Sequence, residues 1–235
     1  MTLPPGYAST YAWSPRRPEA RRLSTSPQEL LQISIAFLVL TLDFVLLLYA
    51  GGYLEGGAPT LLGTIPLWLA IATAATASAT AFVAHELAHK FSAQRRGYWA
   101  EFRWSPFWLA LSVVTAFLGF LFAAPGATVV GGMGDPREWA RTSLAGPLTN
   151  LGFAGVFYAA AVATASWGSI VSFPLLVIAF FNGWFGAFNL VPIGPLDGAK
   201  VLRWSTATWI AAFVVAAAVA GVCYYSLFFL GRPLV

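Results

Sequence analysis

Residues 30–50 read LLQISIAFLVLTLDFVLLLYA, a run in which Asp43 is the only charged residue. An α-helix crosses a bilayer with roughly 20 apolar residues, so this segment is long enough to span a membrane. The whole chain of 235 residues has the same character, because 58% of it is hydrophobic and only 9% is charged. Soluble domains carry about 25% charged residues. The sequence therefore predicts an integral membrane protein.

Other apolar stretches extend this pattern along the chain. Those long enough to span are Ile65 to about His89, Ser143 to Ser166, Ile170 to Leu190 and Ala207 to Leu230. A further stretch, Trp104 to Ala123, is interrupted by Ser105, Pro106 and Gly119. We expect an all-α integral membrane protein, a polytopic helical bundle of five to six spans with a small membrane-associated re-entrant or β-strand element.

The first 29 residues differ from the rest in composition. They are polar and rich in proline and arginine, which predicts a disordered, basic cytoplasmic tail before a transmembrane domain over residues 30–235. Ser26, Pro27 and Glu29 form a helix start, with Ser26 as the N-cap. The formal net charge of +4 comes largely from this tail and from the loop after His89. Attraction to the anionic surface of a lipid bilayer explains both basic segments, and no nucleic-acid partner is expected.

Residues 85–89 read HELAH and contain both histidines of the chain. On a helix, His85 and His89 stand at i and i+4, so they lie on one face and can share a metal ion. Glu86 lies one step round the helix, close enough to reach a metal-bound water without being a ligand itself. The pentapeptide therefore indicates a zinc site with Glu86 as its general base.

A hydrolytic zinc site usually takes three protein ligands and leaves one position for water. Because the sole cysteine, Cys223, is remote in the last span, a carboxylate is expected as the third ligand, and the candidates are Asp43 and Asp197. Asp197 lies in FNLVPIGPLDGAK (188–200), where prolines and glycines stop a helix directly after a span. Non-helical backbone at that depth is tolerated beside protein or a water-filled cavity, where a carboxylate can face a metal. Asp43 is midway along its span, with no such break nearby.

Three motifs stand in order along the chain. They are HELAH (85–89) followed by Ala93 and Gly97, AGPL (145–148) opening a span, and NLVP (189–192) with PLDG (195–198). In this order they resemble the site-2 protease family of intramembrane zinc metalloproteases, over about residues 65–205. The resemblance implies one zinc ion per chain, bound by His85, His89 and Asp197, with Glu86 as catalytic base. It also implies that Asn189 binds substrate or the developing oxyanion.

The sequence departs from the pattern of many family members at two places. Ala88 stands where many have glycine, and Ala199-Lys200 stands where many have Gly-Arg. We expect neither departure to touch a proposed ligand.

The expected activity is hydrolysis of peptide bonds in membrane-spanning or membrane-anchored protein substrates. A transmembrane helix is a poor substrate, because its carbonyls are hydrogen-bonded within the helix, so the enzyme must hold the substrate extended. The β-prone segment GATVV (126–130) would offer a strand edge for pairing. Two alternatives stay open. One is a transporter or channel in which the histidines and Asp43 relay metal ions or protons, and the other is a metal-binding relative without proteolysis.

The side of the membrane follows from charge. If Trp104 to Ala123 does not cross, five crossings remain and basic residues gather on one side. Those on that side are Arg16, Arg17, Arg21, Arg22, Lys90, Arg95, Arg96, Arg103, Arg137, Arg141, Lys200 and Arg203, which leaves Arg232 outside. Because basic residues prefer the cytoplasm, we expect a multi-pass protein of the cell membrane with its active site toward the cytoplasmic side. The sequence does not indicate the oligomeric state.

Overall fold

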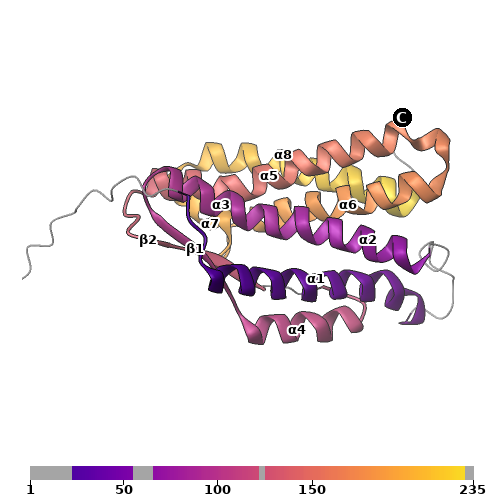
Figure 1. The fold of residues 1–235 in the computed structure, drawn as a ribbon. Coiled ribbons are helices and arrows are strands. Elements are labelled where there is room, and N and C mark those ends of the chain that lie inside the picture. Colours follow the sequence, from indigo (N-terminus) through magenta and orange to yellow (C-terminus); the bar gives the residue numbers. More distant parts are fainter. Residues whose placement is uncertain (1–22, 55–65, 122–124, 231–235) are drawn as a thin grey trace, which may run out of the picture.

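The computed structural model describes residues 23–54, 66–121 and 125–230. In chain order its helices are α1 (Pro27–Leu54), α2 (Leu67–Ala77), the π-helical segment η2 (Ser78–Val83), α3 (Ala84–Arg95), α4 (Pro106–Phe117), α5 (Pro136–Ala163), the 3₁₀ turn η3 (Ala165–Trp167), α6 (Ser169–Asn189), α7 (Asp197–Trp204), α8 (Thr206–Tyr225) and the π-helical segment η4 (Ser226–Leu230). Two strands, β1 (Trp99–Trp104) and β2 (Gly126–Gly131), form a small antiparallel sheet at one end of the helices (Figure 1).

Within the described ranges, five helical segments are long and apolar enough to cross a membrane, which confirms the predicted class. They are Pro27–Leu48, Leu67–Arg95, Pro136–Ala163, Ser169–Asn189 and Thr206–Leu230. The second combines α2, η2 and α3 in one continuous helix. The third begins at Pro136, seven residues before the expected start, because Asp135 caps it by accepting a hydrogen bond from the Arg137 N–H at 2.9 Å. The protein is thus a multi-pass membrane protein.

The stretch Trp104 to Ala123 contains a helix that is too short to span. Helix α4 has 12 residues, or about 18 Å of length, whereas the hydrocarbon core is about 30 Å thick. Strand β1 ends at Trp104 and β2 begins at Gly126, and these two residues pair with each other. The chain therefore returns to the point from which it left. The predicted β-prone segment, residues 126–130, is confirmed as a strand.

The start of α1 is attached to the end of α3. Ser26 Oγ accepts a hydrogen bond from the Glu29 N–H at 3.1 Å, which confirms the predicted N-cap. The Lys90 ammonium donates to Glu29 Oε2 and to Thr25 Oγ1, each at 2.6 Å, and both charged side chains are buried. Residues 1–22 of the expected tail lie outside the described residues, and its expected last residue, Glu29, lies within α1.

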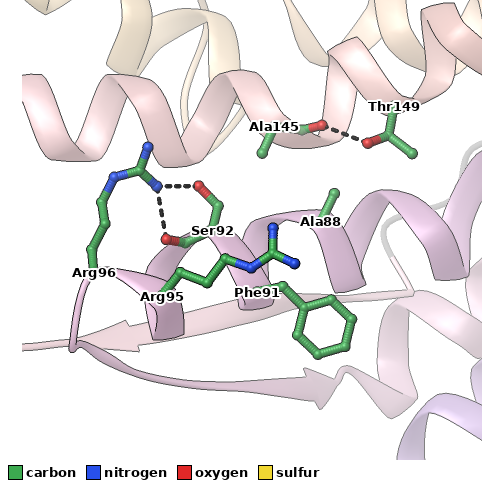
Figure 2. Close-up of a pocket in the computed structure, with 7 residues that line it drawn as sticks. All are labelled: Ala88, Phe91, Ser92, Arg95, Arg96, Ala145 and Thr149. Atoms are coloured by element: carbon green, nitrogen blue, oxygen red, sulfur yellow. Dashed lines mark hydrogen bonds between the residues drawn. The ribbon is translucent and has the colours of Figure 1, made fainter. Parts of the chain in front are cut away.

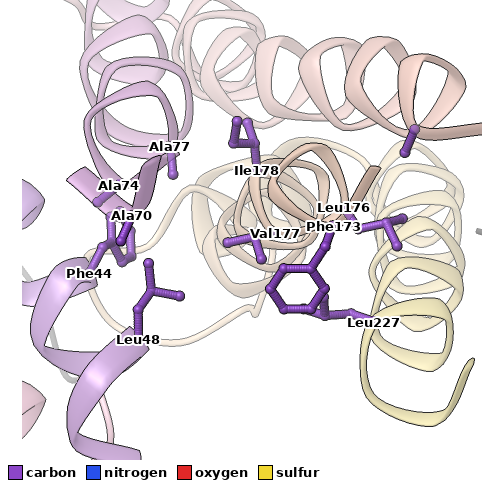
Figure 3. Packing of buried hydrophobic residues seen from close by; sticks show 11 residues of the cluster. Phe44, Leu48, Ala70, Ala74, Ala77, Phe173, Leu176, Val177, Ile178 and Leu227 are labelled. Carbon is purple, nitrogen blue, oxygen red and sulfur yellow. The ribbon is translucent and has the colours of Figure 1, made fainter. Parts of the chain in front are cut away.

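The main apolar cluster lies between α1, α2 and α6, with one residue each from α5 and η4 (Figure 3). Its buried residues are Phe44, Leu48, Ala70, Ala74, Ala77, Ala161, Phe173, Leu176, Val177, Ile178 and Leu227. The alanines of α2 let it approach its neighbours closely, as small residues do between membrane helices. Helix α5 packs along α3, α6 and α7, and thereby links the helix that carries HELAH with the turn that carries Asp197.

Candidate metal centre

His85, His89 and Asp197 converge on one buried point. His85 Nε2 lies 2.9 Å from His89 Nε2, and Asp197 Oδ2 lies 3.4 Å and 2.9 Å from these two nitrogens. All three ligand atoms are within 4.8 Å of one another. Residues more than a hundred positions apart thus form a cluster because α5 holds α3 and α7 together. Of the two carboxylates considered from the sequence, the structure brings Asp197 to the histidines.

The hydrogen bonds of the two histidines determine which ring nitrogen faces the cluster. His85 Nδ1 lies 2.5 Å from Asn150 Oδ1, and His89 Nδ1 lies 2.7 Å from the Thr142 carbonyl oxygen. Both oxygens are acceptors only, so each Nδ1 carries the proton and each Nε2 presents a lone pair. Two lone pairs and a carboxylate oxygen facing one another repel unless a cation lies between them.

The donor set and its spacing fit zinc. Zinc binds imidazole nitrogen and carboxylate oxygen at about 2.0–2.2 Å in a tetrahedral arrangement, which separates two ligand atoms by about 3.3 Å. The three separations of 2.9, 2.9 and 3.4 Å surround that value. Outer hydrogen bonds of the kind made by Asn150 and Thr142 are typical of zinc-bound histidines, since they fix the ring orientation. With three ligands, a fourth position remains for water.

Two glycines allow the ligands to approach each other. A Cβ atom on Gly146 of α5 would lie 2.5 Å from His89 Nε2 and 2.6 Å from His85 Nε2. A Cβ atom on Gly198 would lie 2.0 Å from the Leu190 carbonyl oxygen, so the turn between α6 and α7 closes only with glycine there. Both glycines belong to motifs identified in the sequence. Glycine is needed at each position because a Cβ atom would collide with neighbouring atoms, and not because the backbone there needs a special conformation.

The carboxylate of Asp197 has a defined orientation and charge. Its Oδ2 faces the histidines, while its Oδ1 accepts a hydrogen bond from the Lys200 ammonium at 3.3 Å. The expectation that Lys200 touches no ligand was therefore wrong: one helical turn places the two side chains side by side on α7. Burial raises the pKa of the Asp197 carboxyl, but the polar side chains of His89 and His85 beside it outweigh that effect and hold the pKa well below its usual range. The group is ionised, as a metal ligand must be.

Glu86 lies beside the cluster and is held by β2. Its Oε2 accepts a hydrogen bond from the Thr128 N–H at 2.7 Å and lies 2.8 Å from the Thr128 hydroxyl. Its side chain therefore points to the sheet that packs against α3. The carboxylate is not one of the three clustered ligand atoms. Its role as a base stays a prediction.

Two other residues considered from the sequence lie apart from the cluster. Asn189 Nδ2 donates to the Phe185 carbonyl oxygen within α6, and its role stays a prediction. Asp43 is buried between α1 and α4, where Ser112 Oγ donates to its Oδ2 at 2.6 Å. Neither residue contacts the clustered ligand atoms through a described hydrogen bond.

Sequence reasoning missed the residues that support the ligands. Asn150 and Thr128 are ordinary polar residues, and Thr142 contributes only its backbone carbonyl, so only the folded chain shows which nitrogen or carboxylate each contacts. For Asn150, the sequence does contain one indication that it lies near the ligands. It follows Gly146 by one helical turn in AGPLTN, so the two share a face of α5.

A cavity of about 570 Å³ lies between α3 and α5 (Figure 2). It is lined by Ala88, Phe91, Ser92, Arg95, Arg96, Ala145 and Thr149. The Arg96 guanidinium donates to Ser92 and forms an ion pair with Glu138 at 2.7 Å. The clustered histidines and Asp197 do not line this cavity, which lies on an adjacent face of α3.

Comparison with known proteins gave relatives named as putative zinc metalloproteases. The chain is 35% identical over 130 residues to "Putative zinc metalloprotease MJ0611" of Methanocaldococcus jannaschii, an alignment that covers 54% of this chain and 68% of that protein. It is 33% identical over 155 residues to "Putative zinc metalloprotease Rip3" of Mycobacterium tuberculosis, which covers 63% of this chain and 33% of Rip3. No protein-family model and no solved structure matches the chain.

Proposed function

The chain belongs to the zinc metalloprotease family of MJ0611, and on that basis we propose that it is an intramembrane protease of the site-2 type. It would hydrolyse peptide bonds of membrane-spanning or membrane-anchored protein substrates with one zinc ion per chain. The observation that carries the proposal is the meeting of His85, His89 and Asp197 within 4.8 Å inside a bundle of membrane-length helices.

The roles of the residues follow from their chemistry. Zinc held by His85, His89 and Asp197 would lower the pKa of a bound water to about 7 and would polarise a carbonyl. Glu86, which lies next to the ligands on α3, accepts the proton of the attacking water and passes it to the leaving amine. Asn189, at the end of α6 and eight residues before Asp197, donates from its amide to the developing oxyanion or binds substrate.

The sheet supplies a place for an extended substrate. The outer edge of β1 is occupied by side chains, since Glu29 accepts from the Phe102 N–H, Gln32 accepts from the Trp104 N–H, and Gln94 donates to the Ala100 carbonyl. On the outer edge of β2, Glu86 bonds to the Thr128 N–H. The substrate would add as a strand to β2, which faces the catalytic helix.

The arrangement of charged groups favours proteolysis over transport. A relay of ions through the two histidines and Asp43 needs a continuous polar path, but Asp43 bonds to Ser112 between α1 and α4. The carboxylate that lies beside the two histidines is that of Asp197, and Asp43 is not part of the cluster. We place the active site toward the cytoplasm of the cell membrane, with the lipid bilayer and a transmembrane protein as partners.

The test is a cleavage assay on a panel of membrane-protein substrates with purified protein. Glu86→Gln keeps both histidines, so it should bind zinc at the wild-type ratio and lose cleavage, because an amide cannot accept the proton of the water. Asp197→Ala should lose zinc as well as activity. Cleavage by Glu86→Gln at the wild-type rate would remove Glu86 from the mechanism. Bound zinc without cleavage of any substrate by the wild type would favour the non-proteolytic alternative.

A further inference from the structure

Thr128 contacts Glu86 through three pairs of atoms. Its N–H donates to Glu86 Oε2 at 2.7 Å, and its hydroxyl lies 2.8 Å from the same oxygen and 2.9 Å from the Glu86 backbone carbonyl oxygen. Hydrogen bonds to a charged acceptor are about twice as strong as neutral ones. Thr128 of β2 therefore fixes the direction in which the Glu86 carboxylate points.

The pairing register shows that this N–H belongs to the outer edge of β2, the edge that faces away from β1. Thr128 pairs with Phe102, and the Phe102 N–H points away from β2 to Glu29. In an antiparallel ladder, two residues opposite each other either exchange both hydrogen bonds or direct both N–H groups outward. Thr128 and Phe102 are of the second kind. A strand that adds to β2 would pair with the N–H that now bonds to Glu86.

We propose that Thr128 is a positioning residue whose hydroxyl holds Glu86 in place once the substrate has taken the Thr128 N–H. This inference rests on the proposed proteolytic function and deepens it. When an extended segment adds to β2, its carbonyl oxygen replaces the Glu86 carboxylate on that N–H. The hydroxyl is close to both the carboxylate and the backbone carbonyl of Glu86, so it stays beside this residue after the exchange.

The proposal separates the two donors of Thr128, and substitution can separate them as well. Thr128→Val keeps the shape and the N–H and removes the hydroxyl. Substrate pairing should then persist, with KM changed by less than about twofold, while kcat falls ~10- to 100-fold, the range for a hydrogen bond to a charged group. Zinc content should be unchanged. Thr128→Ser should restore kcat to within about threefold, because a serine hydroxyl supplies the same donor. The matched control is Thr76→Val, since the Thr76 hydroxyl bonds only within its own helix and is exposed.

An unchanged kcat in Thr128→Val would overturn the proposal. So would a variant whose main defect is a raised KM or a loss of zinc. A second measurement does not depend on proteolysis. In zinc-free protein in detergent, Thr128→Val and Glu86→Gln should lower the thermal midpoint less in combination than the sum of their separate shifts, because they remove one contact. Additive shifts would refute the contact. Non-additive shifts together with no cleavage by the wild type would reject the proteolytic function and leave the contact intact.

Discussion

His85 donates a hydrogen bond of 2.5 Å from Nδ1 to Oδ1 of Asn150, which lies 65 residues further along the chain. The amide of Asn150 donates in turn to the Ala81 carbonyl oxygen, at 2.9 Å, in the π-helical segment before HELAH. One buried side chain of α5 thus fixes both the ring orientation of a ligand and the helix that carries it. Its contribution is separable from that of the ligands themselves.

Replacement of Asn150 should weaken zinc binding without removing a ligand. In Asn150→Leu, His85 loses the acceptor for Nδ1–H, and we expect zinc affinity to fall ~10- to 100-fold, as for other outer partners of zinc ligands. Asn150→Asp keeps an acceptor oxygen and should bind zinc more tightly than Asn150→Leu. Competition with a chromophoric chelator measures both affinities. Equal affinities in the wild type and Asn150→Leu would show that the ring needs no such partner.

A methyl group at position 146 should expel the metal. Gly146→Ala would place Cβ 2.5–2.6 Å from the Nε2 atoms of both histidines, so the imidazoles must rotate away from the cluster. We expect loss of zinc and of cleavage. The matched control is Gly152→Ala in the same helix, where a Cβ meets nothing within 4 Å. Metal analysis of the two purified variants decides, and a full zinc complement in Gly146→Ala would contradict the described packing.

Asp43 should be dispensable for metal binding. Its Oδ2 accepts from Ser112 in α4, and asparagine can accept the same hydrogen bond. Asp43→Asn should therefore keep its zinc and much of its activity. Asp197→Asn, the same change at a ligand, serves as the comparison and should lose zinc. Zinc loss in Asp43→Asn would overturn the separation between the two carboxylates.

The side of the membrane can be tested with single cysteines in a Cys223→Ser background. Gly134 lies after the sheet, and Ile193, which is 67% exposed, lies in the turn before Asp197. Cysteines at both positions should react with a membrane-impermeant reagent from the cytoplasmic side only. Trp167, which is 71% exposed between α5 and α6, should react from the opposite side. External labelling at Gly134 would mean that Trp104 to Ala123 crosses the membrane after all.

The sequence was sufficient for the spans and for placing His85 and His89 on one helix face, because both depend on local patterns. Apolar length marks a span, and the i, i+4 spacing of His85 and His89 places two ligands on one face without any tertiary information. The partners of those ligands depend on how α5 and β2 pack against α3. A single polar residue such as Thr128 carries no periodic signal that would identify its contact with Glu86. The contact between Lys200 and Asp197 has a local signal, because the two residues are three positions apart on α7.

The π-helical segment η2 separates two halves of one long helix that have different tasks. Helix α2 packs against α6 with its alanines, and α3 presents the metal ligands to α5. Each residue of an α-helix advances the side-chain direction by about 100°, and a π-helical turn holds more residues than an α-helical one. The number of residues in η2 thus sets the rotation of the α3 side chains relative to those of α2, whichever side chains η2 carries. Loss of one residue between Ser78 and Val83 would leave both surfaces chemically unchanged and still aim the histidines at the wrong neighbour.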